Sequence, residues 1–294
     1  MSQIRELRPL AGVISGVRTF EGEGFAVRRP FPTNRLDHLG PFLLLDEMGP
    51  SENGPGEAKG ASDHPHRGFE TVTYMLDGEI THKDSLGNQG LIAPGDVQWM
   101  TAGAGIVHSE LPSSPILAHG GRMHGFQLWV NLPAAAKMHR PRYQDLTASR
   151  LPSVAFDGGS AVVIGGRAFD TDGPGEIFLP VTYFHLRVDP ERTIDLEIEP
   201  SHLAFVYAFI GRARVGVDAT AIEAGDMAVF PSGTGLLRVI SGAGGLEALV
   251  GSAEPLADPV ARYGPFVMNT RAEILQAFDD FQTGKMGSIQ PERA

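Results

Sequence analysis

The sequence predicts an all-β protein made of two similar halves, and three observations lead to this prediction. The 294 residues include 37 glycines and 22 prolines, which recur at short intervals between runs rich in Val, Ile, Phe and Thr. Such spacing is typical of many short strands joined by turns. The order of turn and strand over residues 94–103 also returns in weaker form over residues 224–233. The length suits one large all-β domain or two ordinary ones.

The clearest strands lie in the first half. Residues 71–76 form a run of Thr, Val, Tyr, Met and Leu, and the Asp-Gly pair at 77–78 favours a hairpin turn into residues 79–84. After the turn-rich residues 85–90, a Pro-Gly-Asp turn leads into a further strand over residues 97–100. This region therefore predicts consecutive antiparallel strands.

The second half repeats this order. Ala224-Gly225-Asp226 leads into residues 227–230, much as the Pro-Gly-Asp turn leads into residues 97–100. Internal duplication is the simplest explanation. We place the boundary within residues 132–143, where prolines interrupt the strand pattern, and expect domains over residues 1–135 and 136–294.

One helix is expected near the C-terminus, over about residues 271–283. Thr270-Arg271-Ala272-Glu273 has the form of a capping box, and Gly284 is suited to end the helix. Apolar residues follow the box at helical spacing, and they are Ile274, Leu275, Phe278 and Phe281. We expect this apolar face to pack on a barrel.

Two tripeptides predict a metal site. His64-Pro65-His66 and His108-Ser109-Glu110 each place two potential ligands two residues apart. In an extended strand such residues point to the same face, and Pro65 favours extended backbone for the residue before it. Three imidazoles and one carboxylate suit iron, nickel, manganese, copper or zinc. The second half lacks this pattern, so we expect it to be metal-free.

Composition restricts the chemistry. The chain has no cysteine, which excludes disulfides, thiolate ligands and cysteine nucleophiles. The net charge is −11 and the basic residues are scattered, which disfavours direct nucleic-acid binding. No stretch approaches the ~20 apolar residues of a membrane helix, and no signal peptide is evident. We therefore expect a soluble, cytoplasmic protein that does not bind membranes.

Several segments resemble the pirin family, and the resemblance covers essentially the whole chain. The matching segments are His64-Pro65-His66-Arg67-Gly68-Phe69-Glu70-Thr71-Val72-Thr73-Tyr74, residues 94–103, residues 105–110, His124-Gly125-Phe126-Gln127-Leu128-Trp129-Val130-Asn131 and Gly264-Pro265-Phe266-Val267-Met268-Asn269-Thr270. The resemblance implies a bicupin fold: two jelly-roll β-barrels packed together, the first binding metal and the second degenerate. A monomer is our expectation.

The resemblance also implies one iron ion held by His64, His66, His108 and Glu110. Nickel, copper, manganese or zinc remain open in its place. Other cupins usually take their carboxylate from the position of Glu70, which makes that residue the rival ligand. By alternation from His66, Glu70 would face the same side as the ion, in an outer or strand-pairing role.

The activity implied by the resemblance is cleavage of a flavonol such as quercetin by molecular oxygen. In this reading Glu110 takes the proton of the 3-hydroxyl group, oxygen adds across the ring, and carbon monoxide leaves. The substrate would be a flavonol or another small enolisable compound. The alternative is an iron-dependent redox sensor without catalytic activity, which binds a transcription factor or a metabolic enzyme. The third hypothesis is that the metal, for example zinc, is structural and that the barrel binds a substrate other than a flavonol.

The other histidines are expected at the surface or in packing, and they are His38, His82, His119, His139, His185 and His202. His124 is a harder case, because it lies in a motif shared with pirins. It could line the cavity, although a structural role is favoured. Trp99 and Trp129 are expected in the core.

Overall fold

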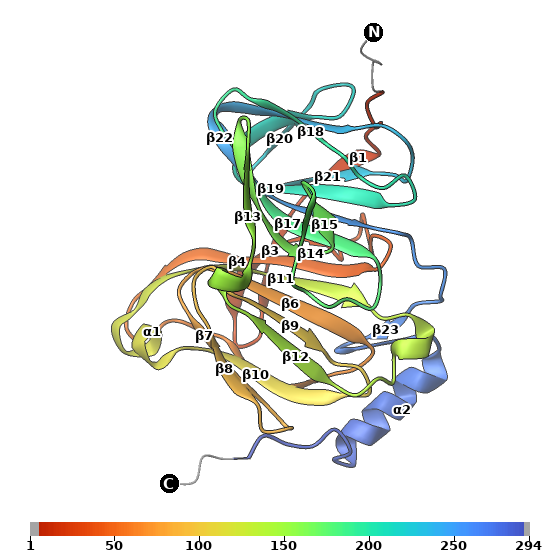
Figure 1. Ribbon diagram of the computed structural model, residues 1–294. Coiled ribbons are helices and arrows are strands. Elements are labelled where there is room, and N and C mark those ends of the chain that lie inside the picture. Colours follow the sequence, from red (N-terminus) through yellow and green to blue (C-terminus); the bar gives the residue numbers. More distant parts are fainter. Residues whose placement is uncertain (1–5, 291–294) are drawn as a thin grey trace. The chain divides into compact units, whose positions relative to one another are not determined.

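Short strands joined by glycine and proline turns form most of residues 6–290, which are the part of the chain that the computed structural model describes (Figure 1). The predicted all-β class is confirmed. The strands collect into two compact units that interleave along the chain. The first unit comprises residues 18–32, 42–148 and 256–290, and the second comprises residues 6–17, 33–41 and 149–255.

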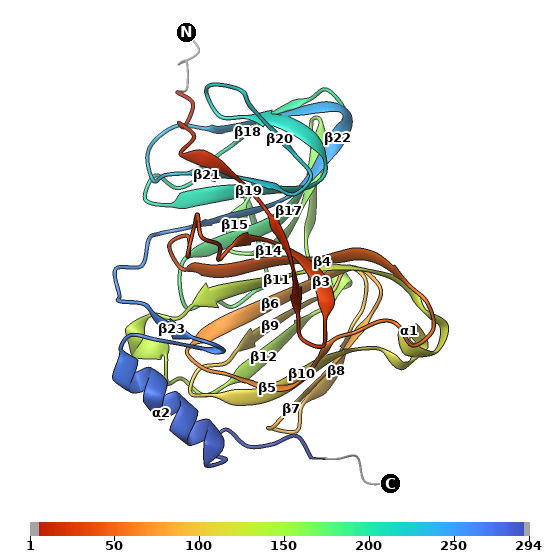
Figure 2. The ribbon, with the colours of Figure 1, turned by 180° about the vertical axis from the view of Figure 1, so that it is seen from behind.

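The first unit contains two antiparallel sheets. The larger sheet has the order β12-β9-β6-β11-β4-β3-β2 and the smaller has the order β5-β10-β7-β8. The strands of the larger sheet are β2 (Val17–Glu21), β3 (Phe25–Phe31), β4 (Phe42–Asn53), β6 (Phe69–Asp77), β9 (Val97–Thr101), β11 (Gly121–Asn131) and β12 (Arg142–Leu146). Those of the smaller sheet are β5 (Ala61–His66), β7 (Ile80–Asp84), β8 (Gln89–Ile92) and β10 (Ile106–Pro112). Figure 2 shows β5 and β10 side by side.

Short elements complete this unit. They are the helix α1 (Ser114–His119), the 3-10 turn η1 (Ala134–Ala136), the hairpin of β23 (Ala261–Tyr263) and β24 (Phe266–Met268), and the C-terminal helix α2 (Arg271–Gln282). A second 3-10 turn, η2 (Ala148–Arg150), lies where the chain passes into the second unit.

The predicted C-terminal helix and its capping box are confirmed. Thr270 Oγ1 accepts a hydrogen bond from the backbone N–H of Glu273, and the Glu273 carboxylate accepts one from the Thr270 backbone. Ile274 and Ala277 are buried and belong to an apolar cluster with Val107, Phe266, Met268 and Met286. Leu275 is exposed, so the buried face of α2 is narrower than the sequence pattern indicated.

The second unit is built on one nine-stranded antiparallel sheet. Its main path is β1 (Gly12–Ser15), β21 (Asp226–Phe230), β19 (Leu203–Val215), β22 (Leu237–Ala253), β17 (Val181–Val188), β14 (Gly159–Gly165) and β13 (Ser153–Phe156). Outside this path, β18 (Thr193–Leu196) pairs with β22 and β20 (Thr220–Glu223) pairs with β19, while β15 (Arg167–Ala168) and β16 (Thr171–Asp172) form a separate hairpin.

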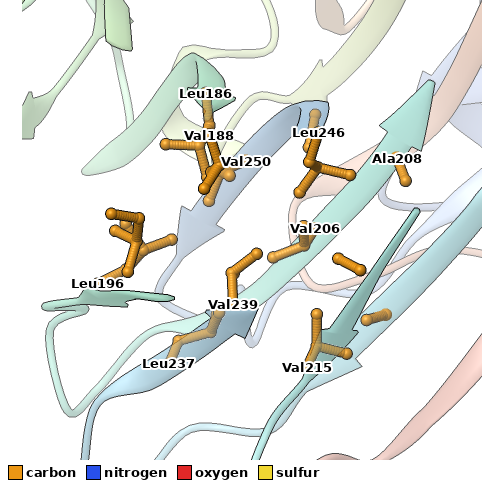
Figure 3. Close-up of a cluster of buried hydrophobic side chains, with 14 of the residues drawn as sticks. Leu186, Val188, Leu196, Val206, Ala208, Val215, Leu237, Val239, Leu246 and Val250 are labelled. Atoms are coloured by element: carbon orange, nitrogen blue, oxygen red, sulfur yellow. The ribbon is translucent and has the colours of Figure 1, made fainter. Parts of the chain in front are cut away.

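An aliphatic core stabilises the second unit. Val206, Val239 and Val250 lie within a cluster of Leu, Val, Ile, Ala and Phe side chains from strands of this sheet (Figure 3). Burying such side chains contributes about 1.5–3 kcal/mol each.

The internal duplication is visible in the turn that precedes β9 and β21. Asp96 accepts a hydrogen bond from the backbone of Ala93, and Asp226 accepts the corresponding bond from Glu223, both over 3.1 Å. The glycine before each aspartate has a positive φ, 87° at Gly95 and 100° at Gly225. An L side chain rarely adopts this conformation, which explains glycine at both positions.

The compact units are not continuous in sequence. The N-terminal strand β1 pairs with β21 in the second unit, whereas β12 pairs with β9 and the helix α2 packs in the first. The chain passes between units at residues 148 and 149 and again at 255 and 256. Because these pairings join residues far apart in sequence, a boundary in chain order misses them.

Candidate metal centre

Strands β5 and β10 bring three of the four predicted ligands together. The antiparallel register places His108 opposite His64 and Ile106 opposite His66. The ring of His64 lies 4.3 Å from that of His108 and 4.8 Å from that of His66, measured between centroids. The potential ligand nitrogens of the three histidines all lie within 4.8 Å of one another. This arrangement can hold one metal ion between three imidazoles.

Backbone carbonyl groups orient two of these rings. Nδ1 of His64 donates to the carbonyl oxygen of Ser62 over 2.7 Å, and Nδ1 of His66 donates to that of Pro265 over 3.4 Å. Because each Nδ1 carries the proton, Nε2 keeps its lone pair. Metal-binding histidines are commonly fixed in this way by their second nitrogen.

His66 and His108 are deeply buried, with exposed fractions of 3% and 1%. Burial, reinforced by the proximity of His64, lowers the pKa of both rings well below the usual value. Both are therefore neutral at pH 7 and can offer a lone pair to a metal. Both nitrogens of His108 also lack a hydrogen-bond partner, an unfavourable state that a bound metal would relieve at one of them. The residues thus fit a metal ion.

Glu110, the fourth predicted ligand, lies beside this group, but its carboxylate is not a member of it. One carboxylate oxygen accepts a hydrogen bond from Thr73 Oγ1 over 2.9 Å, and the other accepts one from Gln127 Nε2 over 2.8 Å. These donors come from β6 and β11 in the opposite sheet. A carboxylate has about four acceptor positions, so both bonds leave room for a metal or a substrate proton.

Gln127 is held in turn by Trp129. The indole Nε1 donates to the Gln127 side-chain oxygen over 3.1 Å, which directs the amide nitrogen toward Glu110. The Trp129 ring packs on Phe69 with a centroid separation of 4.2 Å, and the Arg262 guanidinium lies 5.1 Å from its centroid. Trp129, expected as a core residue, is buried and also lines the cavity described next.

A cavity of about 740 Å³ opens onto His64, His66 and Glu110. Apolar and aromatic side chains form much of its wall, and they include Leu44, Met48, Met75, Ile80, Met123 and Trp129. Charged side chains lie on the wall as well, among them the ion pair of Arg29 with Asp46. All of these residues belong to the first unit, so that unit contains the complete site.

Comparison with known proteins places this architecture in a family. The sequence model of the Pirin family matches residues 24–130, and that of the pirin C-terminal cupin domain matches residues 183–287. The chain belongs to the pirin family. Its fold is therefore the predicted bicupin, with one cupin-type barrel in each unit.

Relatives and solved structures agree with this assignment. A pirin-like protein of tomato, Solanum lycopersicum, is 41% identical over 268 residues, which cover 91% of this chain and 89% of the relative. Human pirin is 39% identical over 270 residues, covering 91% and 90%. A crystal structure described as quercetin 2,3-dioxygenase from Acinetobacter baumannii superposes with a TM-score of 0.91 at 39% identity, covering 97% of this chain and 100% of that one.

In this pirin the rival carboxylate, Glu70, faces away from the metal centre. Thr73 reaches Glu110 from the inner face of β6, and side chains three residues apart on a strand point to opposite faces. The expectation that Glu70 shares the side of the ion is therefore wrong. The alternation does not continue from His66, because the chain turns at Gly68 with φ of 88° before β6 begins.

Glu70 has a pairing role between neighbouring strands. It lies opposite Thr101 of β9 and accepts a hydrogen bond of 2.6 Å from the threonine hydroxyl. Burial raises the pKa of Glu70 to about 7. The Glu70 carboxyl group thus joins β6 to β9 rather than serving as a metal ligand, and its protonation state depends on pH near neutrality.

His124 lines the cavity but has a structural partner. Its Nε2 lies 3.1 Å from a carboxylate oxygen of Glu47 on the neighbouring strand β4. Both residues are buried, and the pair fixes the ring at the wall of the cavity. His119 is exposed and His38 is partly exposed, as expected.

Sequence reasoning missed three polar residues beside the centre. Thr73 and Gln127 contact Glu110, and the His82 ring lies 5.5 Å from that of His108. Thr73 and Gln127 lie directly opposite each other on β6 and β11, which places both side chains on one face. Polar residues at inward positions of two predicted strands are the signal that could have identified them.

No helix within residues 6–290 is long and apolar enough to cross a membrane.

Proposed function

We propose that this pirin binds one iron ion at His64, His66 and His108, with Glu110 as the fourth ligand, and cleaves a flavonol with molecular oxygen. The observation that carries the proposal is the convergence of three imidazoles beside a hydrogen-bonded carboxylate, with His64, His66 and Glu110 lining one cavity. The name of the Acinetobacter baumannii protein supports this choice of reaction.

The cavity is suited to a flat aromatic substrate. Its volume of about 740 Å³ falls within the range of roughly 300–1,000 Å³ that small-molecule sites occupy. Met75 and Ile80 provide apolar surface and Trp129 provides an aromatic one, so a ring system can be buried against them. A substrate seated there would displace water from the centre.

An iron ion at this site supplies Lewis acidity and a redox couple for oxygen chemistry. The three histidines and Glu110 form a mixed nitrogen and oxygen set that also suits nickel, copper, manganese or zinc. Three or four protein ligands leave open positions around an octahedral ion, and open positions are typical of reactive rather than structural sites.

Glu110 is the base of the proposed reaction. Its carboxylate accepts the proton of the flavonol 3-hydroxyl group, which raises electron density in the ring that oxygen attacks. Thr73 and Gln127 donate hydrogen bonds to the two carboxylate oxygens, so the orientation of Glu110 is fixed before the substrate binds. The net reaction consumes one flavonol and one oxygen molecule and releases one carbon monoxide and one ester.

The test is turnover by protein loaded with ferrous iron under anaerobic conditions and then exposed to quercetin and oxygen. We expect loss of flavonol absorbance with the wild type and essentially no loss with His66→Ala or Glu110→Ala. His119→Ala removes an exposed imidazole of α1 and serves as the matched control, with unchanged turnover expected. Turnover that survives either Glu110→Ala or His66→Ala would contradict the assigned roles. Iron-loaded wild type that leaves quercetin intact would favour the regulatory alternative.

A further inference from the structure

His108 and His82 are two adjacent buried imidazoles whose hydrogen-bonding capacity is not used. Each is 1% exposed, and neither ring nitrogen of either residue has a hydrogen-bond partner. Leaving a buried polar group unpaired costs about 1–3 kcal/mol. A metal ion accounts for one nitrogen of His108 and leaves three nitrogens without a function.

His108 differs in this respect from the other two proposed ligands. His64 and His66 each donate their second nitrogen to a backbone carbonyl group, of Ser62 and Pro265 respectively. A metal-bound histidine almost always donates its other ring N–H to an acceptor, which fixes its tautomer and orientation. His108 has no such carbonyl partner, so a neighbouring side chain is the candidate acceptor.

The register of β7 and β10 places His82 in position to be this acceptor. His82 lies opposite Glu110, and Asp84 lies opposite His108, so all four side chains share one face. The rings of His82 and His108 are 5.5 Å apart between centroids and are tilted by 51°. No hydrogen bond joins the two rings in this arrangement, so the bond proposed below requires one or both side chains to rotate.

Asp84 is an anionic neighbour of His82 that is held by its own hydrogen bonds. One of its oxygens lies 3.9 Å from Nε2 of His82. The carboxylate accepts hydrogen bonds from the backbone of Leu86 and from the backbone and side chain of Asn88, over 2.7–2.9 Å. Asp84 is therefore held in place by its own loop, and a hydrogen bond between the two residues requires His82 to move toward it.

We propose that His82 is a positioning residue, which accepts a hydrogen bond from His108 while it donates its Nε2 proton to Asp84. The resulting order is Asp84, His82, His108 and metal. It fixes the tautomer of His108 and makes this ligand a stronger donor toward the ion. Tyr143 packs on His82 with a centroid separation of 4.5 Å and restrains its ring.

A second cavity provides the competing explanation. His82 and Tyr143 line a space of about 790 Å³ that is also bounded by residues 86–90, 139–142, Gln98 and Asp145. A water molecule there could satisfy His82 instead. In that case the loss of His82 would leave the metal affinity and the spectrum of the bound ion unchanged. The two explanations thus differ in a measurable property of the bound ion.

The proposal rests on the metal centre of the proposed function and does not depend on the substrate. The experiment titrates metal-free protein with cobalt(II) and records both the dissociation constant and the visible ligand-field spectrum. We expect His82→Phe to weaken binding by about 10- to 100-fold and to shift the spectrum. His82→Gln, which keeps an acceptor, should restore most of the affinity, and Asp84→Asn should change the spectrum in the same direction as His82→Phe.

His185→Phe is the matched control. His185 is also a fully buried imidazole paired with a carboxylate, Glu247, but it lies in the second unit. It can lower the folding stability without changing cobalt binding. Variants that bind cobalt with wild-type affinity and spectrum would overturn the role of His82, whereas failure of the wild type to bind cobalt would overturn the metal centre itself.

A measurement on the wild type remains decisive if His82→Phe does not fold. In zinc-loaded protein with 15N-labelled histidine, NMR should show His82 as the Nε2–H tautomer, protected from exchange. The Nδ1–H tautomer, or rapid exchange with water, would contradict the proposal.

Discussion

Gln127 donates a hydrogen bond of 2.8 Å from Nε2 to a carboxylate oxygen of Glu110, across the space between the two sheets of the first unit. Trp129 fixes the direction of this bond, since its indole N–H occupies the Gln127 oxygen. The proposed base is thus oriented from the opposite sheet. A change at Gln127 should affect the reaction although Gln127 is not a metal ligand.

Gln127→Leu should lower kcat for quercetin cleavage by about 10- to 100-fold. A hydrogen bond to a charged group contributes about 1.5–3 kcal/mol, and 1.4 kcal/mol corresponds to a factor of ten. Steady-state kinetics of the iron-loaded variant provide the measurement. The prediction fails if kcat stays within twofold of the wild type while the iron content is equal.

Glu70 should make the folding stability depend on pH. Its pKa rises from 4.5 to about 7 in the folded state because the group is buried. The contribution of the neutral Glu70 side chain to the free energy of unfolding is therefore complete below pH 4.5 and is lost as the pH rises through 7. Relative to Glu70→Gln, the wild type should lose about 3 kcal/mol between pH 4 and pH 8.

Denaturant unfolding of both proteins across this pH range checks the prediction. The difference between wild type and Glu70→Gln cancels the contributions of groups that the two proteins share. A difference that does not vary with pH would show that Glu70 does not titrate between these values.

Asp280→Ala should destabilise the first unit by about 3 kcal/mol. Asp280 on α2 accepts a hydrogen bond of 2.9 Å from Arg67, the residue that directly follows His66. The side chain of Arg67 is 5% exposed. Removing one partner of a buried pair leaves the other charge uncompensated. Metal affinity should also fall, because Arg67 anchors the backbone beside a ligand.

Asp279→Ala is the neighbouring control for this experiment. The Asp279 carboxylate is 62% exposed, and exposed substitutions usually change stability by less than about 0.5 kcal/mol. Thermal unfolding and cobalt titration of both variants provide the comparison. Equal behaviour of the two variants would mean that the pair of Asp280 and Arg67 does not support the centre.

Removal of metal should lower the unfolding temperature. An ion that binds only the folded state adds about 2.7 kcal/mol to the free energy of unfolding at a free concentration of 100 times Kd. A chelator should abolish this gain in the wild type, and His66→Ala should show no gain at all. An unfolding temperature of the wild type that is independent of added metal would argue against the site.

The pairing of His64 with His66 on one face could be predicted from sequence because its geometry is local. His64 and His66 are separated by one proline on one strand, so alternation alone places their side chains on one face. The face of Glu70 was predicted wrongly, because the turn at Gly68 interrupts that alternation. The alternation of side chains thus gave correct faces within a strand and a wrong face when it was continued across the turn to the next strand.

The surroundings of Glu110 could not be predicted in the same way. Thr73 and Gln127 reach it from a different sheet, and His82 becomes adjacent to His108 only through the register of β7 and β10. The unit boundaries have the same origin, since β1 joins β21 over 200 residues away. Contacts of this kind depend on the complete fold.

The proposed reaction is cleavage of a flavonol by oxygen at the metal centre, with Glu110 as the base. Its most direct test is the amount of carbon monoxide released per oxygen molecule consumed when iron-loaded protein acts on quercetin. We predict one carbon monoxide per oxygen for the wild type and none above background for Glu110→Gln. Oxygen consumption without release of carbon monoxide would rule out this cleavage reaction. Equal release of carbon monoxide by Glu110→Gln would rule out Glu110 as its base.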